Sequence, residues 1–317
     1  MVKRKIIIVA IVVIIVLLFA LIFAVNYFYG ESVKRGVEVE LYSGDKIVED
    51  VAIEDKVILE EAQQWFANQE LQQVEQVSND GLLLKSIFLE NVKSTGKAVI
   101  LAHGYREQSE NMGDFAKFYY DQGFDILIPD ARGHGKSEGE YVGYGWHDRL
   151  DYLKWIDLLI NDYQADKIIL HGKSMGASLV LMTSGEELPN EVKAIIADSG
   201  YTTVKEELSY QLQHLYNLPS FPLLDLTSLM TKIRAGYSFE EASAIEQVKH
   251  NTRPLFIIHG EEDELVPTEM ANRLYNTANG EKELWIVPKA GHTKAHTMAT
   301  SEYEERLLQF IKTASKE

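Results

Sequence analysis

Short apolar segments alternate with longer stretches of helical periodicity from Lys97 onward, and this alternation limits what the chain can fold into. The short segments span residues 98–102, 125–129, 167–170, 194–197, 255–258 and 284–287. Strands joined by crossover helices form a mostly parallel sheet, because each crossover returns the chain to the same end of the sheet. The pattern therefore predicts an α/β fold with a mostly parallel central sheet and helices on both faces. The chemistry of such sheets lies at the carboxyl ends of the strands.

Two segments before this alternation, 71–77 and 82–89, predict a β-hairpin that forms an antiparallel edge of the sheet. The residues between them include Asp80-Gly81, a pair that tolerates the positive φ angles of a tight turn. Residues 31–70 carry charge runs such as Glu49-Asp50 around a helical pattern, and we interpret them as a stalk that packs onto the main domain. The apolar positions of that helical pattern are Ile58, Ala62, Trp65 and Phe66.

Residues 201–237 are too long for one crossover helix and are rich in Tyr, Leu and Phe. They predict one or two amphipathic helices that form a small cap. The helical stripe in this segment consists of Val204, Leu208, Leu212 and Leu215. We therefore divide the chain into a membrane anchor at 1–30, a stalk or packing segment at 31–70 and a main domain at 71–317 that includes the cap.

The anchor is predicted from Lys3, Arg4 and Lys5, which precede an uncharged apolar run from Ile6 to about Tyr29. A run of this length crosses a bilayer as a helix. A cleaved signal peptide has a shorter apolar core and a cleavage site of small residues, so we predict an uncleaved signal-anchor, with cleavage as the alternative. The basic flank favours a cytoplasmic N-terminus, which puts the remaining chain outside the cell membrane.

Composition excludes several classes of site. The chain has no cysteine, so it contains no disulfide, thiolate zinc site, iron-sulfur cluster or cysteine nucleophile. Its formal charge of −17 disfavours nucleic acid as a partner. The sequence has no Asn-x-Ser/Thr acceptor either, and together with the absent cysteines this favours a bacterial surface protein.

A candidate nucleophile lies in the stretch Gly172-Lys173-Ser174-Met175-Gly176. The pattern Gly-x-Ser-x-Gly is weak alone, but here it follows the apolar strand at 167–170 and opens a predicted helix, as a nucleophile elbow requires. We therefore predict that Ser174 is the nucleophile rather than a serine that caps an ordinary helix. The oxyanion hole would use the backbone N–H groups of Met175 and of Tyr105, in the loop after the first parallel strand.

A serine nucleophile needs a base and an acid that orients the base. Of nine histidines, only His292 and His296 follow the last predicted strand, where chain order puts the base, and we prefer His292 in its loop. A metal site formed by this pair would lack a third ligand. The acid is expected after the strand at 255–258, and Asp198 is its rival. The carboxylates that compete there are Glu261, Glu262, Asp263 and Glu264, of which we favour Asp263.

These motifs jointly resemble those of the α/β-hydrolase superfamily over residues 71–311. The matching stretches are His103-Gly104, residues 130–137, the elbow at 172–176, residues 259–267 and Ala290-Gly291-His292. The family pattern Gly-x-x-Asp-x-x-Val-Pro selects Asp263, and its Gly-His pattern selects His292. The chain also looks like the membrane-anchored surface hydrolases of low-GC Gram-positive bacteria. Lys173 stands where many relatives carry histidine, a departure that concerns substrate preference.

The resemblance implies a serine hydrolase that cleaves a small-molecule acyl ester through an acyl-enzyme, with no cofactor or metal. The small aromatic cap favours a carboxylesterase. A peptidase or acyltransferase with the same triad is the alternative, and a catalytically silent surface binding module is a third. The lipid bilayer is the expected partner of the first helix.

Overall fold

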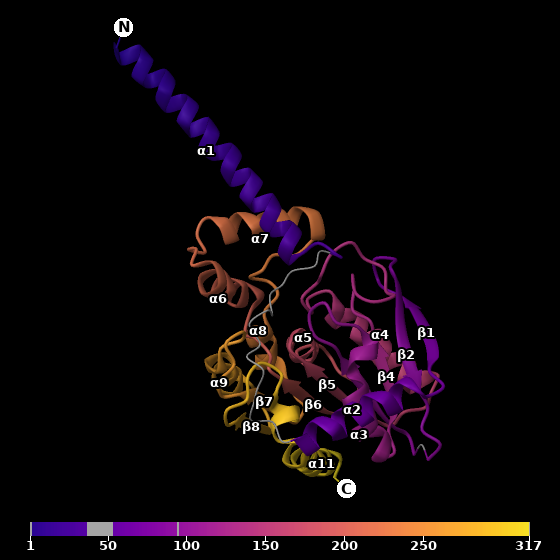
Figure 1. Ribbon diagram of the computed structural model, residues 1–317. Coiled ribbons are helices and arrows are strands. Elements are labelled where there is room, and N and C mark those ends of the chain that lie inside the picture. The colour runs from indigo at the N-terminus through magenta and orange to yellow at the C-terminus, as the bar shows by residue number, and fades with distance from the viewer. Residues whose placement is uncertain (1, 37–52, 94, 317) are drawn as a thin grey trace.

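The computed structural model describes residues 2–36, 53–93 and 95–316 (Figure 1). A single eight-stranded sheet forms the centre of the molecule, and helices surround it. The strands are β1 (Gln72–Val77), β2 (Leu83–Leu89), β3 (Lys97–Ala102), β4 (Asp125–Pro129), β5 (Lys167–Lys173), β6 (Val192–Asp198), β7 (Leu255–Gly260) and β8 (Lys282–Val287). The helices are α1 (Val2–Ser32), α2 (Ile53–Ala67), α3 (Gly113–Asp121), α4 (Asp148–Asn161), α5 (Met175–Thr183), α6 (Val204–Tyr216), α7 (Leu223–Ala235), α8 (Ala244–Gln247), α9 (Thr268–Thr277), α10 (Ala295–Met298) and α11 (Thr300–Ser315), with 3₁₀ helices η1 (Ser109–Met112) and η2 (Val248–His250).

The sheet has the order β1-β2-β4-β3-β5-β6-β7-β8 and is parallel except at one edge. The strand β1 pairs antiparallel with β2, which pairs antiparallel with β4, and the remaining neighbours are parallel. The predicted α/β fold, its hairpin edge and its six strand segments are therefore confirmed. The strand β5 continues past the predicted end at residue 170, because its ladder with β6 runs on to the pair Lys173 and Asp198.

Alternate residues of the central strands point into two different helix layers. In β3, Ile100 packs in the cluster that contains α4 and α5, whereas Val99 and Leu101 pack in the cluster that contains α3 and α11. Both faces are thus covered, which explains why these strands are unbroken apolar runs. The helix α2 joins the second layer through buried Phe66 and contacts α3. The predicted charge run Glu49-Asp50 lies outside the described residues.

The cap consists of α6 and α7, which leave the sheet after β6 at the end of the molecule where α1 arrives (Figure 1). The predicted stripe of α6 is correct at Val204 and Leu212, which are buried. Leu215 is exposed instead, so the predicted stripe is wrong at its last position. The physical reason is that the last turn of α6 reaches toward α1, where the ring of Tyr216 meets that of Phe28 at 5.9 Å.

Among the described residues, α1 is the one helix long and apolar enough to cross a membrane. Most of its apolar side chains are exposed, but Val25 and Tyr29 in its last turns are buried and the helix contacts α7. Just after the helix, Val33 is buried, and the Arg35 guanidinium donates to the carbonyls of Ser137 at 2.7 Å and Gly135 at 2.8 Å. The end of α1 is therefore packed into the folded domain.

Candidate active site

The turn between β5 and α5 gives Ser174 an unusual backbone conformation, with φ of 55° and ψ of −117°. The flanking glycines make this turn possible. A Cβ atom on Gly172 would collide with the carbonyl group of Gly176, and one on Gly176 would collide with the carbonyl oxygen of Ala102. The turn leaves Ser174 at the N-terminus of α5, where the helix dipole favours negative charge. This geometry is the strand-turn-helix that the sequence pattern predicts.

The three residues predicted for the triad come together at the carboxyl ends of the strands. The Oγ of Ser174 lies 2.8 Å from Nε2 of His292, and Nδ1 of His292 lies 2.8 Å from Oδ2 of Asp263. Asp263 follows β7, and His292 follows β8. When Nδ1–H donates to the carboxylate, Nε2 is left as an acceptor for the serine proton.

The carboxylate of Asp263 is buried and fully engaged in hydrogen bonds. Its Oδ1 accepts from the backbone N–H groups of Leu265 at 2.9 Å and Val266 at 2.8 Å. Burial alone would raise the pKa of Asp263, but the charge of His292 and hydrogen bonds from His259 and His292 hold it well below its ordinary value. Asp263 is therefore ionised at neutral pH and is able to stabilise an imidazolium.

His259, which sequence reasoning treats as structural, supports this acid directly. Its Nε2 lies 3.1 Å from Oδ2 of Asp263 and 2.8 Å from the carbonyl oxygen of Val266. Burial lowers the pKa of His259, but the hydrogen bond with Asp263 outweighs it and the pKa is raised. The only hint of this role in the sequence is its position four residues before the acid, at the end of β7.

The rival residues face other partners. Asp198 accepts from the Tyr303 hydroxyl and the Ser199 hydroxyl, each at 2.9 Å, and burial raises its pKa. His296 lies 3.3 Å from Asp114 and 3.5 Å from Glu304. His292 and His296 thus face different carboxylates and do not form one ligand set. Among the described residues, no group of three His, Cys, Asp or Glu side chains is arranged to hold a metal ion.

The loop predicted to supply an oxyanion donor is fixed by Glu107. The Gly104 N–H donates to Oε2 of Glu107 at 2.9 Å, so it is occupied. Within the part of the chain that the structure describes, the Tyr105 N–H has no hydrogen-bond partner. Met175 is the first residue of α5, and an N–H at that position has no acceptor inside the helix. The arrangement therefore leaves both predicted backbone donors available for a substrate oxygen.

Lys173 links the elbow to this loop, because its Nζ lies 3.1 Å from Oε1 of Glu107. Burial lowers the pKa of Lys173, but the carboxylates of Glu107 and Asp114 outweigh it and raise the pKa, which keeps the ammonium charged. The departure from the family pattern thus has a structural account. A cation in the elbow and an anion in the facing loop hold the turn at Ser174 and the predicted oxyanion loop together.

The end of α1 also contacts the predicted oxyanion loop at Tyr105 and Arg106, a contact that no sequence signal predicts. The Tyr105 hydroxyl donates to the carbonyl of Ser32 at 2.9 Å, and the buried Tyr144 hydroxyl donates to the same carbonyl at 2.6 Å. The Arg106 guanidinium donates to the carbonyl of Glu31. The rings of Tyr105 and Tyr144 stack at 5.4 Å. The apolar helix and the loop after β3 therefore form one hydrogen-bonded unit.

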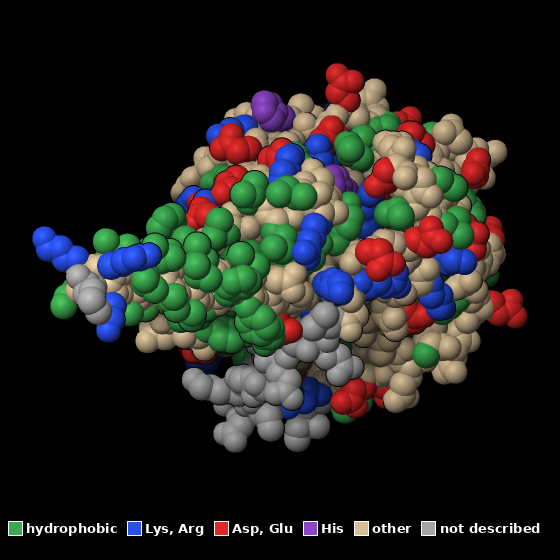
Figure 2. Space-filling view, turned by 90° about the horizontal axis from the view of Figure 1, so that it is seen from above, with side chains coloured by type: hydrophobic (Ala, Val, Ile, Leu, Met, Phe, Trp, Pro, Cys, Tyr) green, Lys and Arg blue, Asp and Glu red, His purple; other side chains and the backbone are tan. Residues whose placement is uncertain are grey.

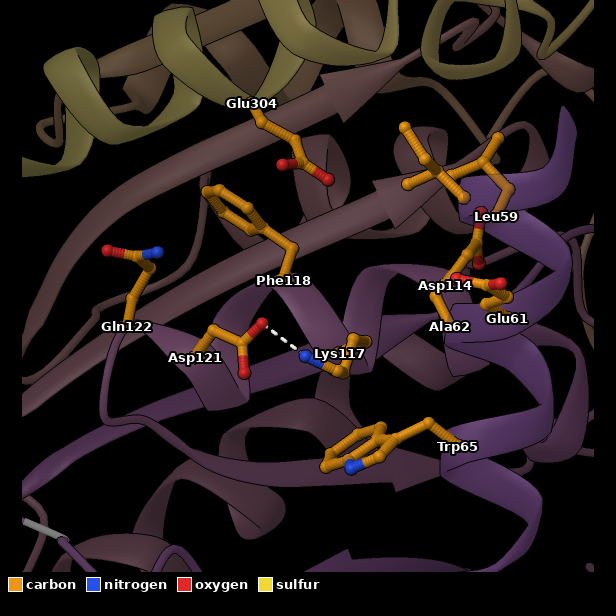
Figure 3. A pocket seen from close by; sticks show the side chains of 11 residues that line it. Leu59, Glu61, Ala62, Trp65, Asp114, Lys117, Phe118, Asp121, Gln122 and Glu304 are labelled. Atoms are coloured by element: carbon orange, nitrogen blue, oxygen red, sulfur yellow. Dashed lines mark hydrogen bonds and ion pairs between the residues drawn. The ribbon is translucent and has the colours of Figure 1, made fainter. Parts of the chain in front are cut away.

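A pocket away from these residues lies between α2, α3 and α11 (Figure 3). Figure 3 shows that its lining includes the carboxylates of Glu61, Asp114, Asp121 and Glu304. Lys117 pairs with Asp121 there. Among the described residues that line this pocket there is no serine or histidine, so the candidate nucleophile and base both lie elsewhere.

Comparisons with known proteins show which families and structures this chain is similar to. Residues 93–226 match the family described as serine aminopeptidase, S33. The uncharacterized protein YqkD of Bacillus subtilis is 31% identical over 218 residues, which cover 68% of this chain and 72% of YqkD. The lysophosphatidylserine lipase ABHD12 of Mus musculus is 28% identical over 201 residues, which cover 61% of this chain and 48% of that protein. The esterase Pf2001 of Pyrococcus furiosus superposes with a TM-score of 0.63 at 25% identity, covering 77% of this chain and 92% of the esterase.

Proposed function

The chain belongs to the α/β-hydrolase superfamily, and we propose that it is a serine hydrolase in which Ser174, His292 and Asp263 form the catalytic triad. The observation that carries the proposal is the continuous chain of two 2.8 Å contacts from the Ser174 hydroxyl through the imidazole to the carboxylate. A serine hydroxyl is a poor nucleophile until a base takes its proton, and this arrangement supplies that base in an oriented state.

The proposed reaction has two halves that use only groups of the chain and water. Ser174 Oγ attacks the acyl carbonyl carbon, Nε2 of His292 takes the hydroxyl proton, and Asp263 stabilises the imidazolium. The N–H groups of Tyr105 and Met175 donate to the developing oxyanion. His292 then protonates the leaving alcohol, and the acyl-enzyme remains. Water attacks the acyl carbon, His292 takes a proton from the water and returns it to Ser174, and the carboxylic acid leaves.

A carboxylesterase is the first choice of activity, and the likeness to an esterase and to a lipase that acts on lysophosphatidylserine supports it. A peptidase or acyltransferase with the same triad is the second choice, since the matching family is described as serine aminopeptidases.

The experiment that separates these activities is a panel of p-nitrophenyl esters graded from acetyl to palmitoyl, run beside aminoacyl p-nitroanilides on the purified full chain. A carboxylesterase gives kcat/KM values for the best ester that exceed those for every anilide by roughly tenfold or more. A preference for anilides would support the peptidase instead. If no substrate turns over and a fluorophosphonate probe fails to label the protein, the domain is a silent binding module.

We further infer that α1 is an uncleaved membrane anchor with its basic N-terminus in the cytoplasm and the hydrolase domain outside, on a bacterial cell surface. The corresponding division is an anchor at 1–30, a packing segment at 31–70 and a hydrolase domain at 71–317 with its cap at 201–237. The burial of Val25 and Tyr29 supports retention, because cleavage after the helix would remove both side chains from the core. The intact mass of the protein from a membrane fraction tests this, since a cleaved signal would remove the apolar run.

A further inference from the structure

The cap helix α7 carries large apolar side chains on its outward face, which an ordinary surface helix does not. Its buried positions are Leu224, Thr227, Ser228, Thr231 and Ala235, which are mostly small or hydroxylated. Its outward positions include Leu229 and Ile233, whose exposed fractions are 56% and 77%. A helix on the surface of a water-soluble domain normally turns its large apolar side chains inward. The outward face of α7 therefore needs an apolar or interfacial environment.

The buried hydroxyl groups of α7 have hydrogen-bond partners within the protein, so this face of the helix is able to pack against the domain without water. The hydroxyls of Thr227 and Thr231 each donate to a backbone carbonyl one turn earlier, at 2.8 Å. The Ser228 hydroxyl donates to the carboxylate of Glu240 at 2.8 Å. Hydroxyl groups satisfied in this way are able to line a packed interface. A rotation that buried Leu229 and Ile233 would break the hydrogen bond from Ser228 to Glu240, which lies outside α7.

The exposed apolar surface extends from α7 into the neighbouring turn and onto α1. We define the cap patch as Leu215, Tyr216, Leu218, Phe221, Leu229 and Ile233, all of which are exposed. Figure 2 shows apolar side chains continuing from the protruding α1 over the adjoining surface. The Arg234 guanidinium bridges the two helices, since it donates to Asn26 at 3.1 Å and lies over the ring of Tyr29. The cap patch is thus continuous with the helix that we propose as the membrane anchor.

We propose that the cap patch is a second membrane-contacting surface, which lies in the headgroup and acyl boundary of the leaflet that α1 leaves. The proposal rests on the proposed anchor. The helix α7 lies across α1 near its folded end (Figure 1), where Arg234 of α7 lies over the ring of Tyr29, and the end of α1 also carries Tyr27 and Phe28. Aromatic side chains at the end of a span mark the interface, and an amphipathic helix lies in the interface plane with its apolar face toward the acyl chains. Arg234 in the last turn of α7 adds a positive charge at this boundary, whereas Lys232 is paired with Glu241.

Single-cysteine labelling of the full chain tests this contact, because the natural sequence has no cysteine. The variants Leu229→Cys and Ile233→Cys carry the fluorophore NBD in vesicles of phosphatidylcholine and phosphatidylglycerol. Val92→Cys is the matched control, an apolar residue just after β2 with 87% exposure. Ile14→Cys in α1 reports on the anchor. We expect doxyl lipids to quench the labels at 229, 233 and 14, with iodide quenching at 229 and 233 about threefold or more weaker than at 92.

Three other quenching patterns would overturn the cap patch proposal, each for a different reason. If iodide quenches the labels at 229 and 233 as strongly as that at Val92 while the Ile14 label remains lipid-quenched, the anchor stands and the cap patch proposal is overturned. Labels at 229 and 233 that are protected from iodide yet insensitive to doxyl lipids, with protection lost on dilution, would assign the patch to a second copy of the chain. An Ile14 label that iodide reaches would overturn the anchor itself, and the cap patch proposal with it.

Discussion

Ser174 has a positive φ of 55° with ψ of −117°, a backbone conformation that a residue with a side chain rarely adopts. A non-glycine residue in such a region costs about 1–3 kcal/mol and persists only where the surroundings impose it. Hydrogen bonds on both sides of the turn hold Ser174 in this conformation. The Ser174 N–H donates to the carbonyl of Asp198 at 2.8 Å, and the Ser178 N–H donates to the carbonyl of Ser174 at 3.1 Å. The strand before the serine and the helix after it thus aim its hydroxyl at His292.

The choice between two acids gives the first prediction. Asp263→Asn removes the charge that stabilises the imidazolium and offers His292 an amide, so kcat/KM for a soluble ester should fall roughly 10³- to 10⁴-fold. Asp198→Asn is the matched control, since Asp198 bonds Tyr303 and Ser199 instead. Steady-state kinetics on both variants, with circular dichroism to verify folding, decides the matter. A larger loss in Asp198→Asn would reverse the assignment of the acid.

His296 gives a prediction on stability and pH. Burial lowers its pKa, but the carboxylates of Asp114 at 3.3 Å and Glu304 at 3.5 Å outweigh burial and raise the pKa to about 9. A pKa raised on folding adds stability below the unfolded value of about 6.5, and this is lost as pH rises through about 9. The free energy of unfolding of the wild type relative to His296→Gln should therefore shrink by roughly 1–3 kcal/mol between about pH 6 and about pH 9.

Urea unfolding in mild detergent measures this difference, and esterase activity of the same variant is the accompanying control. His296→Gln should keep its activity, because His292 and not His296 contacts the serine. An unfolding difference that stays constant with pH would show that His296 is not held charged in the folded protein.

Features of single residues were predictable from the sequence where the backbone geometry permits only one residue type. Gly172 and Gly176 are examples, because a Cβ atom at either position would collide with backbone atoms. The pairing of Lys173 with Glu107 was not predictable, because a charge in the sequence does not name its partner. The support that His259 gives Asp263 was missed for a related reason, as a buried strand-end histidine is equally compatible with a purely structural role.

At the scale of elements, the unexpected unit is the end of α1 with the loop after β3. The acceptors that α1 offers are backbone carbonyls of residues 31 and 32, more than 70 positions before Tyr105 and Tyr144. Every residue type carries such a carbonyl, so the sequence holds no sign of the contact. The hairpin and the crossover strands were predictable, by contrast, because their apolar periodicity reflects local burial.

This unit predicts that Tyr105 positions the oxyanion loop through its side chain as well as supplying an N–H. Tyr105→Phe removes the hydroxyl that bonds the carbonyl of Ser32, so the loop loosens and kcat for a soluble ester should fall about 5- to 50-fold with little change in KM. Tyr237→Phe is the matched control, because its buried hydroxyl donates to the carbonyl of Val142 at 2.6 Å. Equal losses of kcat in the two variants would mean that only general stability is affected.

On the scale of the whole molecule, the end of the proposed anchor, the cap and the candidate site share one end of the domain. The end of α1 contacts the predicted oxyanion loop, and Gln211 of α6 donates to the carbonyl of Leu265, two residues after the proposed acid Asp263. Two elements of the proposed membrane surface, α1 and α6, therefore contact the loops that carry Tyr105 and Asp263. The cap segment was predictable as helical, but its outward polarity was not, because only the fold decides which face of α7 turns inward.

Because the cap and the candidate site lie at the same end of the domain, we predict that the rate of hydrolysis depends on whether the ester is embedded in a membrane or dissolved in water. The double variant Leu229→Ser with Ile233→Ser should hydrolyse an ester embedded in vesicles about 3- to 10-fold more slowly than the wild type, because the cap no longer seats in the leaflet. Its rate on a water-soluble ester should be unchanged. Val92→Ser is the control for loss of an exposed apolar side chain. Equal rates of the double variant and the wild type on vesicles would contradict this prediction.

The central claim is that Ser174 is the nucleophile, and covalent labelling tests it most directly. The full chain in detergent is treated with a fluorophosphonate probe, the modified peptide is located by mass spectrometry, and Ser174→Ala is treated in parallel. We predict one label, on Ser174, with loss of both label and ester hydrolysis in the Ser174→Ala variant. A Ser174→Ala protein that is still labelled, or that hydrolyses aryl esters at the wild-type rate, would contradict the claim.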